Sequence, residues 1–213
     1  LAITAFRGPD GRPLLAVGDD EGTVRIWDVA DGTEQPVLGD HGGRMKAVAA
    51  FTGPDGRTLL ASGGTEGAVR IWDPAQGGTE AVLTGHTDWV RAVAAFTGPD
   101  GRTLLASGSA DHTVRIWDVA EGTSRVLSGH TDTVTALAAF PGPDGRTLLA
   151  SGGHDHTVRI WDPAHGSAEG TLSGHAHGAN AVAAFPGAYG RTLLATAGRD
   201  GRGRVWDLAP GST

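Results

Sequence analysis

The sequence contains no cysteine and only one methionine, one tyrosine and one lysine. The absence of cysteine excludes disulfides, thiolate nucleophiles and zinc sites built from thiolates. Apolar runs are also short, about five residues as in residues 47–51, whereas a membrane-spanning helix needs about 20. No secretory signal opens the sequence. We therefore predict no membrane partner and expect the protein to be cytoplasmic.

Positive charge is scarce as well, because 24 acidic residues outnumber 17 basic ones and leave a formal net charge of −7. Binding to nucleic acid without regard to sequence relies on a broad positive field. One short cluster of Arg199, Arg202 and Arg204 lies in a glycine-rich turn, and such a cluster in an acidic protein is typical of a solvated surface. We predict no nucleic-acid partner.

Glycine, by contrast, is abundant at 35 of 213 residues, which disfavours helices and favours tight turns. Trp-Asp pairs recur at 27/28, 72/73, 117/118, 161/162 and 206/207, a step of 44 or 45 residues. Residues 51–63 recur unchanged as 96–108. A chain of this length most often forms one domain, and repeats this similar must share one conformation.

Each repeat alternates short apolar runs with turn residues. In the third repeat we predict strands at 92–96, 104–107, 114–117 and 125–127, with a tight turn over Pro99-Asp100-Gly101-Arg102 between the first two. A four-stranded sheet cannot bury both of its faces alone. Stacking of the sheets around an axis solves this problem, and the pattern therefore predicts an all-β propeller.

Gly-His pairs at 85/86, 129/130 and 174/175, with Asp40-His41 as a variant, each lie 31 residues before the tryptophan of their repeat. With the Trp-Asp pairs, they make the sequence resemble the WD40 repeat family over nearly all of its length. The resemblance implies a single WD40 propeller domain, or a portion of one, of four-stranded antiparallel blades, residues 1–213, with repeats at about 1–39, 40–84, 85–128, 129–173 and 174–213.

The resemblance also implies two distinct rims. The Gly-His turns and the turns between the second and third strands share one rim, called the top here, whereas the turns such as Pro99 to Arg102 share the bottom rim. WD40 propellers commonly hold partners on the top rim.

Three repeats place a histidine, a hydroxyl residue, an aspartate and a tryptophan at the same offsets. These tetrads are His86, Ser107, Asp111 and Trp117; His130, Ser151, Asp155 and Trp161; and His175, Thr196, Asp200 and Trp206. An indole donates, a hydroxyl donates and accepts, and an imidazole links hydroxyl to carboxylate, so the four can satisfy one another when buried. We interpret them as structural braces. The second repeat has Glu66 in place of the aspartate, and the first has Val17 and no histidine, so we expect weaker bracing there.

A hydrolase is the competing interpretation of these residues. It would need an exposed nucleophile and an oxyanion hole, and no Gly-x-Ser-x-Gly motif is present. The pairs His154/His156 and His175/His177 resemble metal ligands, but they belong to different turns, and a structural site needs three or four converging ligands. No Gly-Lys-Ser/Thr sequence is available to bind nucleotide phosphates. We predict no catalytic residue, no metal and no cofactor.

Positions that differ among the repeats are free of the demands of the fold, and several of them lie on the predicted top rim. The candidate partner-binding residues are Arg44, Lys46, Trp89, Arg91, His154 and Arg199. Trp89 is the one tryptophan outside a Trp-Asp pair, and an aromatic residue among basic ones is typical of interface hot spots. The alternative is that Trp89 only covers a neighbouring loop.

These features favour a non-catalytic scaffold or sensor that binds a protein or peptide, as part of a larger bacterial signalling protein. The alternative is a lectin-like propeller that binds carbohydrate or another small ligand at equivalent sites between blades. An aromatic platform repeated in every unit would favour that alternative, and Trp89 is not repeated.

The number of residues in the sequence predicts that the ring is not completely closed. The path from Trp206 through the two chain ends to Trp27 spans 34 residues, which is 11 fewer than one repeat. We expect a parent protein with further repeats; a self-contained five-bladed ring and a ring completed by a second copy are the alternatives. An open arc would leave two apolar blade faces exposed, and each would favour self-association.

Overall fold

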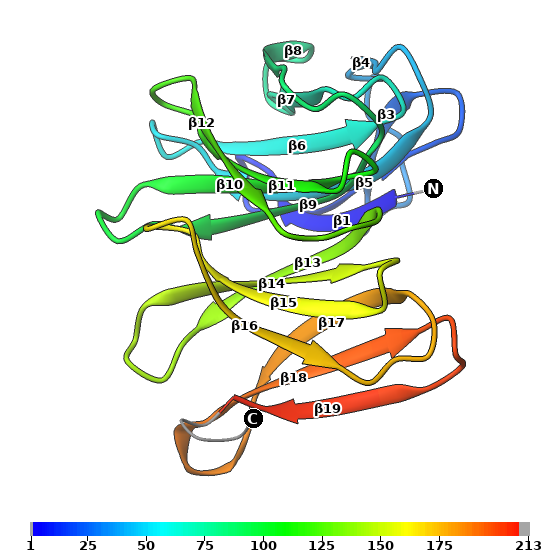
Figure 1. Ribbon diagram of the computed structural model, residues 1–213. Helices are drawn as coiled ribbons and strands as arrows, with labels where there is room; N and C mark the ends of the chain where they lie inside the picture. The colour runs from blue at the N-terminus through cyan, green and yellow to red at the C-terminus, as the bar shows by residue number, and fades with distance from the viewer. Residues whose placement is uncertain (1, 209–213) are drawn as a thin grey trace.

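The computed structural model describes residues 2–208, and Figure 1 shows their arrangement. These residues form 19 β-strands and one 3-10 turn, η1 (Ala188–Gly190). The predicted all-β class is confirmed. Within the described range, no helix is long and apolar enough to cross a membrane.

The strands pair in antiparallel fashion into five sheets, which we call blades 1 to 5. Blade 1 contains β1 (Ala2–Arg7), β2 (Pro13–Gly18), β3 (Thr23–Asp28) and β4 (Gly39–Asp40). Blade 2 contains β5 (Met45–Thr52), β6 (Thr58–Gly64), β7 (Val69–Trp72) and β8 (Thr79–Leu83). Blade 3 contains β9 (Val90–Thr97), β10 (Thr103–Ser109), β11 (Thr113–Asp118) and β12 (Thr123–Ser128). Blade 4 contains β13 (Val134–Pro141), β14 (Thr147–Gly153), β15 (Thr157–Asp162) and β16 (Ser167–Ser173), and blade 5 contains β17 (Ala179–Pro186), β18 (Thr192–Gly198) and β19 (Gly203–Asp207).

Local sequence explains the hairpins. In blade 3, the amide of Gly98 donates to the carbonyl of Arg102 at 2.8 Å, and Gly101 between them has a φ of +80°. Glycine adopts this left-handed conformation without steric cost, so the Pro-Asp-Gly-Arg sequence closes the turn between β9 and β10. All four strands predicted in this repeat are present, and each extends one or two residues further at either end than predicted.

The core lies between blades. The innermost strands of successive blades contact each other, β1 with β5, β5 with β9, β9 with β13 and β13 with β17. A separate apolar cluster fills each of the four interfaces, and the tryptophan of the later blade is part of it: Trp72, Trp117, Trp161 and Trp206. Every blade thus depends on its neighbour to bury its faces.

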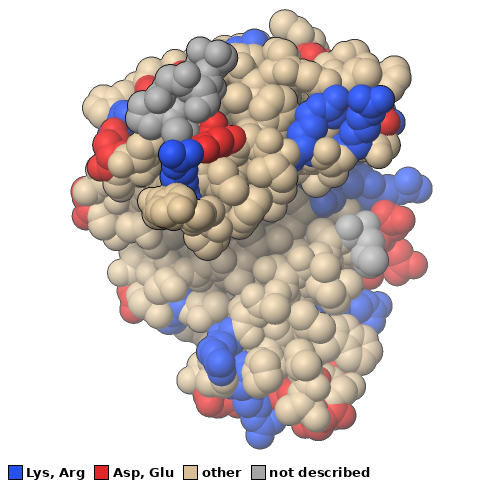
Figure 2. Space-filling model, turned by 90° about the horizontal axis from the view of Figure 1, so that it is seen from below, with Lys and Arg blue, Asp and Glu red and all other residues tan. Residues whose placement is uncertain are grey.

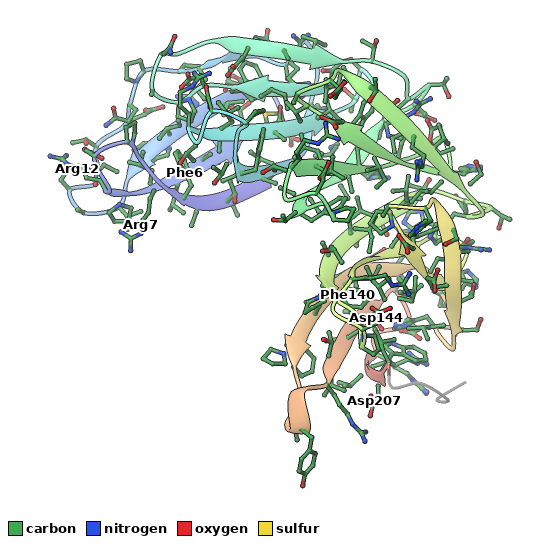
Figure 3. The ribbon with its side chains drawn as sticks, turned by 90° about the vertical axis from the view of Figure 1, so that its left-hand side faces the viewer. Phe6, Arg7, Arg12, Phe140, Asp144 and Asp207 are labelled. Carbon is green, nitrogen blue, oxygen red and sulfur yellow. The ribbon has the colours of Figure 1, made fainter. Side chains whose placement is uncertain are left out.

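The five blades form an open arc. Figure 3 shows two arms, with Phe6 and Arg12 on the first and Phe140 and Asp207 on the second, separated by open space. Blade 5 has three strands within residues 2–208, where the other blades have four. The prediction of a propeller whose ring is not closed in this chain is confirmed.

Candidate functional site

The structure brings the predicted tetrad of blade 3 together. His86 Nε2 lies 2.8 Å from Ser107 Oγ, and His86 Nδ1 lies 2.7 Å from Asp111 Oδ2. The indole of Trp117 donates to Ser107 Oγ at 2.7 Å. Because an indole N–H can only donate, the serine hydroxyl is left to donate to His86 Nε2, and His86 Nδ1–H donates to the carboxylate. Ser107 is completely buried, so the four side chains form an unbroken series of hydrogen bonds away from solvent.

Blades 4 and 5 repeat this arrangement. In blade 4, His130 lies 2.7 Å from Ser151 and 2.8 Å from Asp155, and Trp161 donates to Ser151 at 2.8 Å. In blade 5, His175 lies 2.8 Å from Thr196 and 3.2 Å from Asp200, and Trp206 donates to Thr196 at 2.9 Å. Arg204 also donates to Asp200 at 2.9 Å. Threonine replaces serine because only the hydroxyl takes part.

Burial and hydrogen bonding set the protonation states. Burial lowers the pKa of His86 and of His130, despite the aspartates beside them. Burial alone would raise the pKa of Asp111, but hydrogen bonds from Thr113 and His86 outweigh it and lower that pKa to about 2. At neutral pH the imidazole is therefore neutral and the carboxylate ionised, which is the combination that the chain of donors requires.

Blade 2 departs from this pattern. Trp72 donates to Ser62 at 2.7 Å, as expected, and His41 Nδ1 lies in close contact with the carboxylate of Glu66. Glu66 is thus the partner of Nδ1, whereas Nε2 of the buried His41 is without a hydrogen-bond partner in the described part of the chain. The chain of hydrogen bonds is therefore interrupted between the hydroxyl and the imidazole.

Blade 1 has no tetrad. Val17 pairs with Arg25 across the strands, at the position where the other blades have serine or threonine. Trp27 is 36% exposed, whereas the corresponding Trp72 is fully buried. No histidine lies in this blade.

The bottom rim carries a second set of repeated contacts, which we did not predict from the sequence. The arginine that ends each bottom turn pairs with the aspartate of the Trp-Asp pair in the same blade. The pairs are Arg12–Asp28 at 3.1 Å, Arg102–Asp118 at 2.9 Å, Arg191–Asp207 at 2.7 Å, and Arg57–Asp73 and Arg146–Asp162. Both residues occur in all five repeats, 16 residues apart in each, and that constant spacing was the available signal.

On the top rim, two sets of positions that vary among the repeats lie side by side. The residue three positions after each Gly-His histidine accepts, through its carbonyl, a hydrogen bond from the amide of the residue before the turn carboxylate. These pairs are Arg44 with Thr65, Trp89 with Ala110, Thr133 with His154 and Gly178 with Arg199, at 2.8 to 3.1 Å. The backbone thus fixes both positions while their side chains are free to vary.

Trp89 projects from this rim and is 43% exposed. Its neighbour in the adjoining turn is Ala110, which is too small to cover the ring. The Nζ of Lys46 lies 6.0 Å from the centre of the indole ring and the guanidinium of Arg91 lies 5.6 Å from it. Cation–π contacts of this kind contribute about 0.5 to 1 kcal/mol at exposed sites, enough to bias the orientation of the ring.

Acidic residues flank the same surface. A shallow pocket between blades 1, 2 and 3 is lined by Trp89, Arg44 and Thr65 on one side and by Asp20, Glu21 and Asp40 on the other. Lys46 Nζ lies 3.9 Å from the carboxylate of Asp20. The surface therefore carries an aromatic and basic side next to an acidic one.

His154 and Arg199 continue this surface over blades 4 and 5. Burial, and after it the charge of Arg199, lowers the pKa of His154, and Arg91 acts in the same direction. His154 is therefore neutral at pH 7. Lys46 and Arg91 thus lie over Trp89, Arg44 lines the same pocket as Trp89, and the charges of Arg91 and Arg199 act on His154. We call the six predicted residues Arg44, Lys46, Trp89, Arg91, His154 and Arg199 the top-rim patch.

Histidine pairs and an arginine cluster in the sequence resemble a metal site and a nucleic-acid surface, respectively. His156 and His177 stack edge to face with ring centres 5.9 Å apart, but no group of three or more metal-ligating side chains converges anywhere in residues 2–208. Figure 2 shows lysine and arginine in separate patches interspersed with acidic residues on the face that it views.

Four-stranded antiparallel blades that stack around an axis define the class of β-propeller proteins. Residues 2–28, 32–73, 77–118, 122–162 and 166–207 each match the WD40 family, described as WD domain, G-beta repeat. These segments make up most of the chain, and the chain therefore belongs to the WD40-repeat family. Repeats of this family generally form scaffolds for protein–protein interaction. No curated protein shows significant similarity to the chain.

Proposed function

We propose that this protein is a non-catalytic scaffold or sensor that binds a protein or peptide on the top-rim patch, as one part of a larger bacterial signalling protein. The observation that carries the proposal is the exposed Trp89, held by two cations on a rim where the repeats differ. The fold does not require tryptophan there, because the same backbone position holds Arg44, Thr133 and Gly178 in other blades.

The chemistry of the patch indicates the partner. An aromatic side chain can stack on the exposed indole, and a carboxylate can pair with Arg91 or Lys46. We therefore expect a peptide that combines an aromatic residue with an acidic one.

Selection of peptides from a random display library on the wild-type protein tests this proposal. Enriched peptides should contain aromatic and acidic residues, and their affinity should fall about 30-fold or more in Trp89→Ala, equivalent to about 2 kcal/mol. The melting temperature of this variant should be nearly unchanged, since the ring is half exposed.

Tyr189→Ala is the matched control, because Tyr189 is an exposed aromatic residue in the bottom turn of blade 5. Peptide affinity should be unaffected in this variant. Equal affinity of the selected peptides for the Trp89 and Tyr189 variants would contradict the proposal.

The lectin-like alternative has one observation in its favour. Two grooves on the bottom rim, one between blades 1 and 2 and one between blades 3 and 4, are lined by corresponding residues such as Arg12 and Arg102. However, the described residues that line them include no aromatic ring, and Asp28 already accepts hydrogen bonds from Arg12 and from the amide of Ala30. Binding on a glycan array that survives Trp89→Ala would favour this alternative over peptide docking.

A further inference from the structure

The internal repeat allows the two ends of the arc to be compared with the interfaces inside it. Each blade has one face that packs on the preceding blade and one that packs on the following blade. At the four internal interfaces both faces are covered by the apolar clusters. The outer face of blade 1 and the outer face of blade 5 are the same two kinds of face without a neighbour in residues 2–208.

The outer face of blade 1 is apolar and exposed. Ile3 pairs with Val17, which also pairs with Arg25, and Leu15 pairs with both Ala5 and Trp27, so these side chains form two adjacent rows that are apolar except for Arg25. Ile3 is 62% exposed. Its counterpart in blade 3, Val93, packs against the cluster shared with blade 2. Val17 contributes a further apolar group where the internal interfaces have a hydroxyl.

The outer face of blade 5 is its counterpart. Phe185 pairs with Leu193, and Ala195 pairs with Val205. Val205 is 64% exposed, whereas Ile160, the residue at the same position in blade 4, is 5% exposed. Phe185 is likewise exposed, while Phe140 at the same position in blade 4 is buried.

The two outer faces are complementary because the repeat places on them residues that correspond to those meeting at the internal interfaces. At the interface between blades 4 and 5, Phe140 and Ile160 pack with Leu194 and Trp206. Phe185 and Val205 correspond to the first two of these residues, and Leu15 and Trp27 correspond to the last two. Removing apolar area from water contributes about 25 cal/mol per Å², so both faces gain if they meet.

We propose that the outer face of blade 5 in one molecule packs on the outer face of blade 1 in a second copy of the chain, so that the protein self-associates head to tail. The contact uses two different surfaces, and it therefore continues from copy to copy until a ring closes or a filament forms. It does not involve the top-rim patch.

Mass measurement by light scattering over a range of concentrations tests this proposal. The wild-type chain of 21.7 kDa should increase in mean mass with concentration. Ile3→Glu places a charge on the first face and Val205→Glu places one on the second, and burying an unpaired charge opposes association. Each variant alone should remain a monomer at concentrations where the wild type associates.

Mixing the two variants gives the decisive result. Ile3→Glu retains an intact blade 5 face, and Val205→Glu retains an intact blade 1 face, so the mixture should form a dimer of twice the monomer mass and nothing larger. Val126→Glu is the matched control, because Val126 is an exposed valine on the outer strand β12. This variant should associate like the wild type. Circular dichroism should confirm that all three variants are folded.

Three results would overturn the proposal. They are a wild-type chain that stays monomeric at every concentration, either end variant that still dimerises alone, and a mixture of the two that stays monomeric. Trp89→Ala should leave the mass unchanged, so failure of peptide docking and failure of self-association are distinguishable.

Discussion

His130 and Ser151 are joined inside blade 4 by a hydrogen bond of 2.7 Å between Nε2 and Oγ, and both side chains are buried. The other ring nitrogen of His130 lies 2.8 Å from Asp155. A buried polar group that loses its partner costs free energy, because water cannot replace the bond. The stability of the blade should therefore depend on the imidazole.

We predict that His130→Ala destabilises the protein by about 1 to 3 kcal/mol, because it leaves Ser151 and the ionised Asp155 without their link. Chemical denaturation measures the change. His156→Ala is the control, since His156 is an exposed histidine in the same blade, and it should have little effect. Equal stability of the two variants would contradict the interpretation of the tetrad as a brace.

Blade 2 has Glu66 where blade 3 has Asp111, and exchanging these residue types should change the free energy of unfolding in opposite directions. Glu66→Asp shortens the carboxylate beside His41, which allows the ring to approach Ser62 and gives its unpartnered Nε2 a hydrogen bond. We expect a gain of about 0.5 to 1.5 kcal/mol in the free energy of unfolding.

Asp111→Glu makes the opposite change in blade 3, and it should lower that free energy by a similar amount. The two variants should be compared by urea denaturation under the same conditions. Loss of stability in both would show that carboxylate length does not limit the brace in blade 2.

Stability should fall in acid. Burial lowers the pKa of His86 and His130 below the ordinary value of 6.5, so the unfolded chain takes up protons before the folded one does. The free energy of unfolding should therefore decrease as the pH drops below about 6.5. A further decrease should follow below the ordinary carboxyl value of 3.8, because hydrogen bonds keep the pKa of Asp111 at about 2 in the folded protein.

Urea denaturation at several pH values between about 8 and 3 measures this dependence. His130→Ala should show a shallower decrease between neutral pH and pH 5 than the wild type, since one buried imidazole is gone. A wild-type protein that becomes more stable on acidification from neutral pH would contradict the prediction.

Close contact between blades predicts the effect of a single methyl group. A Cβ on Gly39 would lie 2.8 Å from Cζ3 of the buried Trp72. Gly39→Ala should therefore destabilise the interface of blades 1 and 2 by about 1 to 3 kcal/mol. A Cβ on Gly170 in β16 would meet nothing within 4 Å, so Gly170→Ala should be neutral or slightly stabilising. Thermal melts of the two variants measure both effects.

Much of the architecture follows from the sequence alone, because repetition multiplies each local signal. Turn residues, apolar alternation and the spacing of the Trp-Asp pairs predicted the strands and the stacking of blades. The same repetition grouped His86, Ser107, Asp111 and Trp117, since the chemistry of their donors and acceptors admits one complete arrangement. It also singled out Trp89 as a position that the fold leaves free.

Tertiary structure decided what depends on distances between atoms of different strands. The missing partner of His41 Nε2 and the pairing of Arg102 with Asp118 depend on side-chain reach across a turn, which spacing does not specify. Lys46, one of the two cations over Trp89, comes from the neighbouring blade 2, so its approach depends on how the blades stack. The exposure of Trp27 also depends on tertiary structure alone. The same tryptophan occurs in every repeat, and it is buried only where the arc places another blade against it.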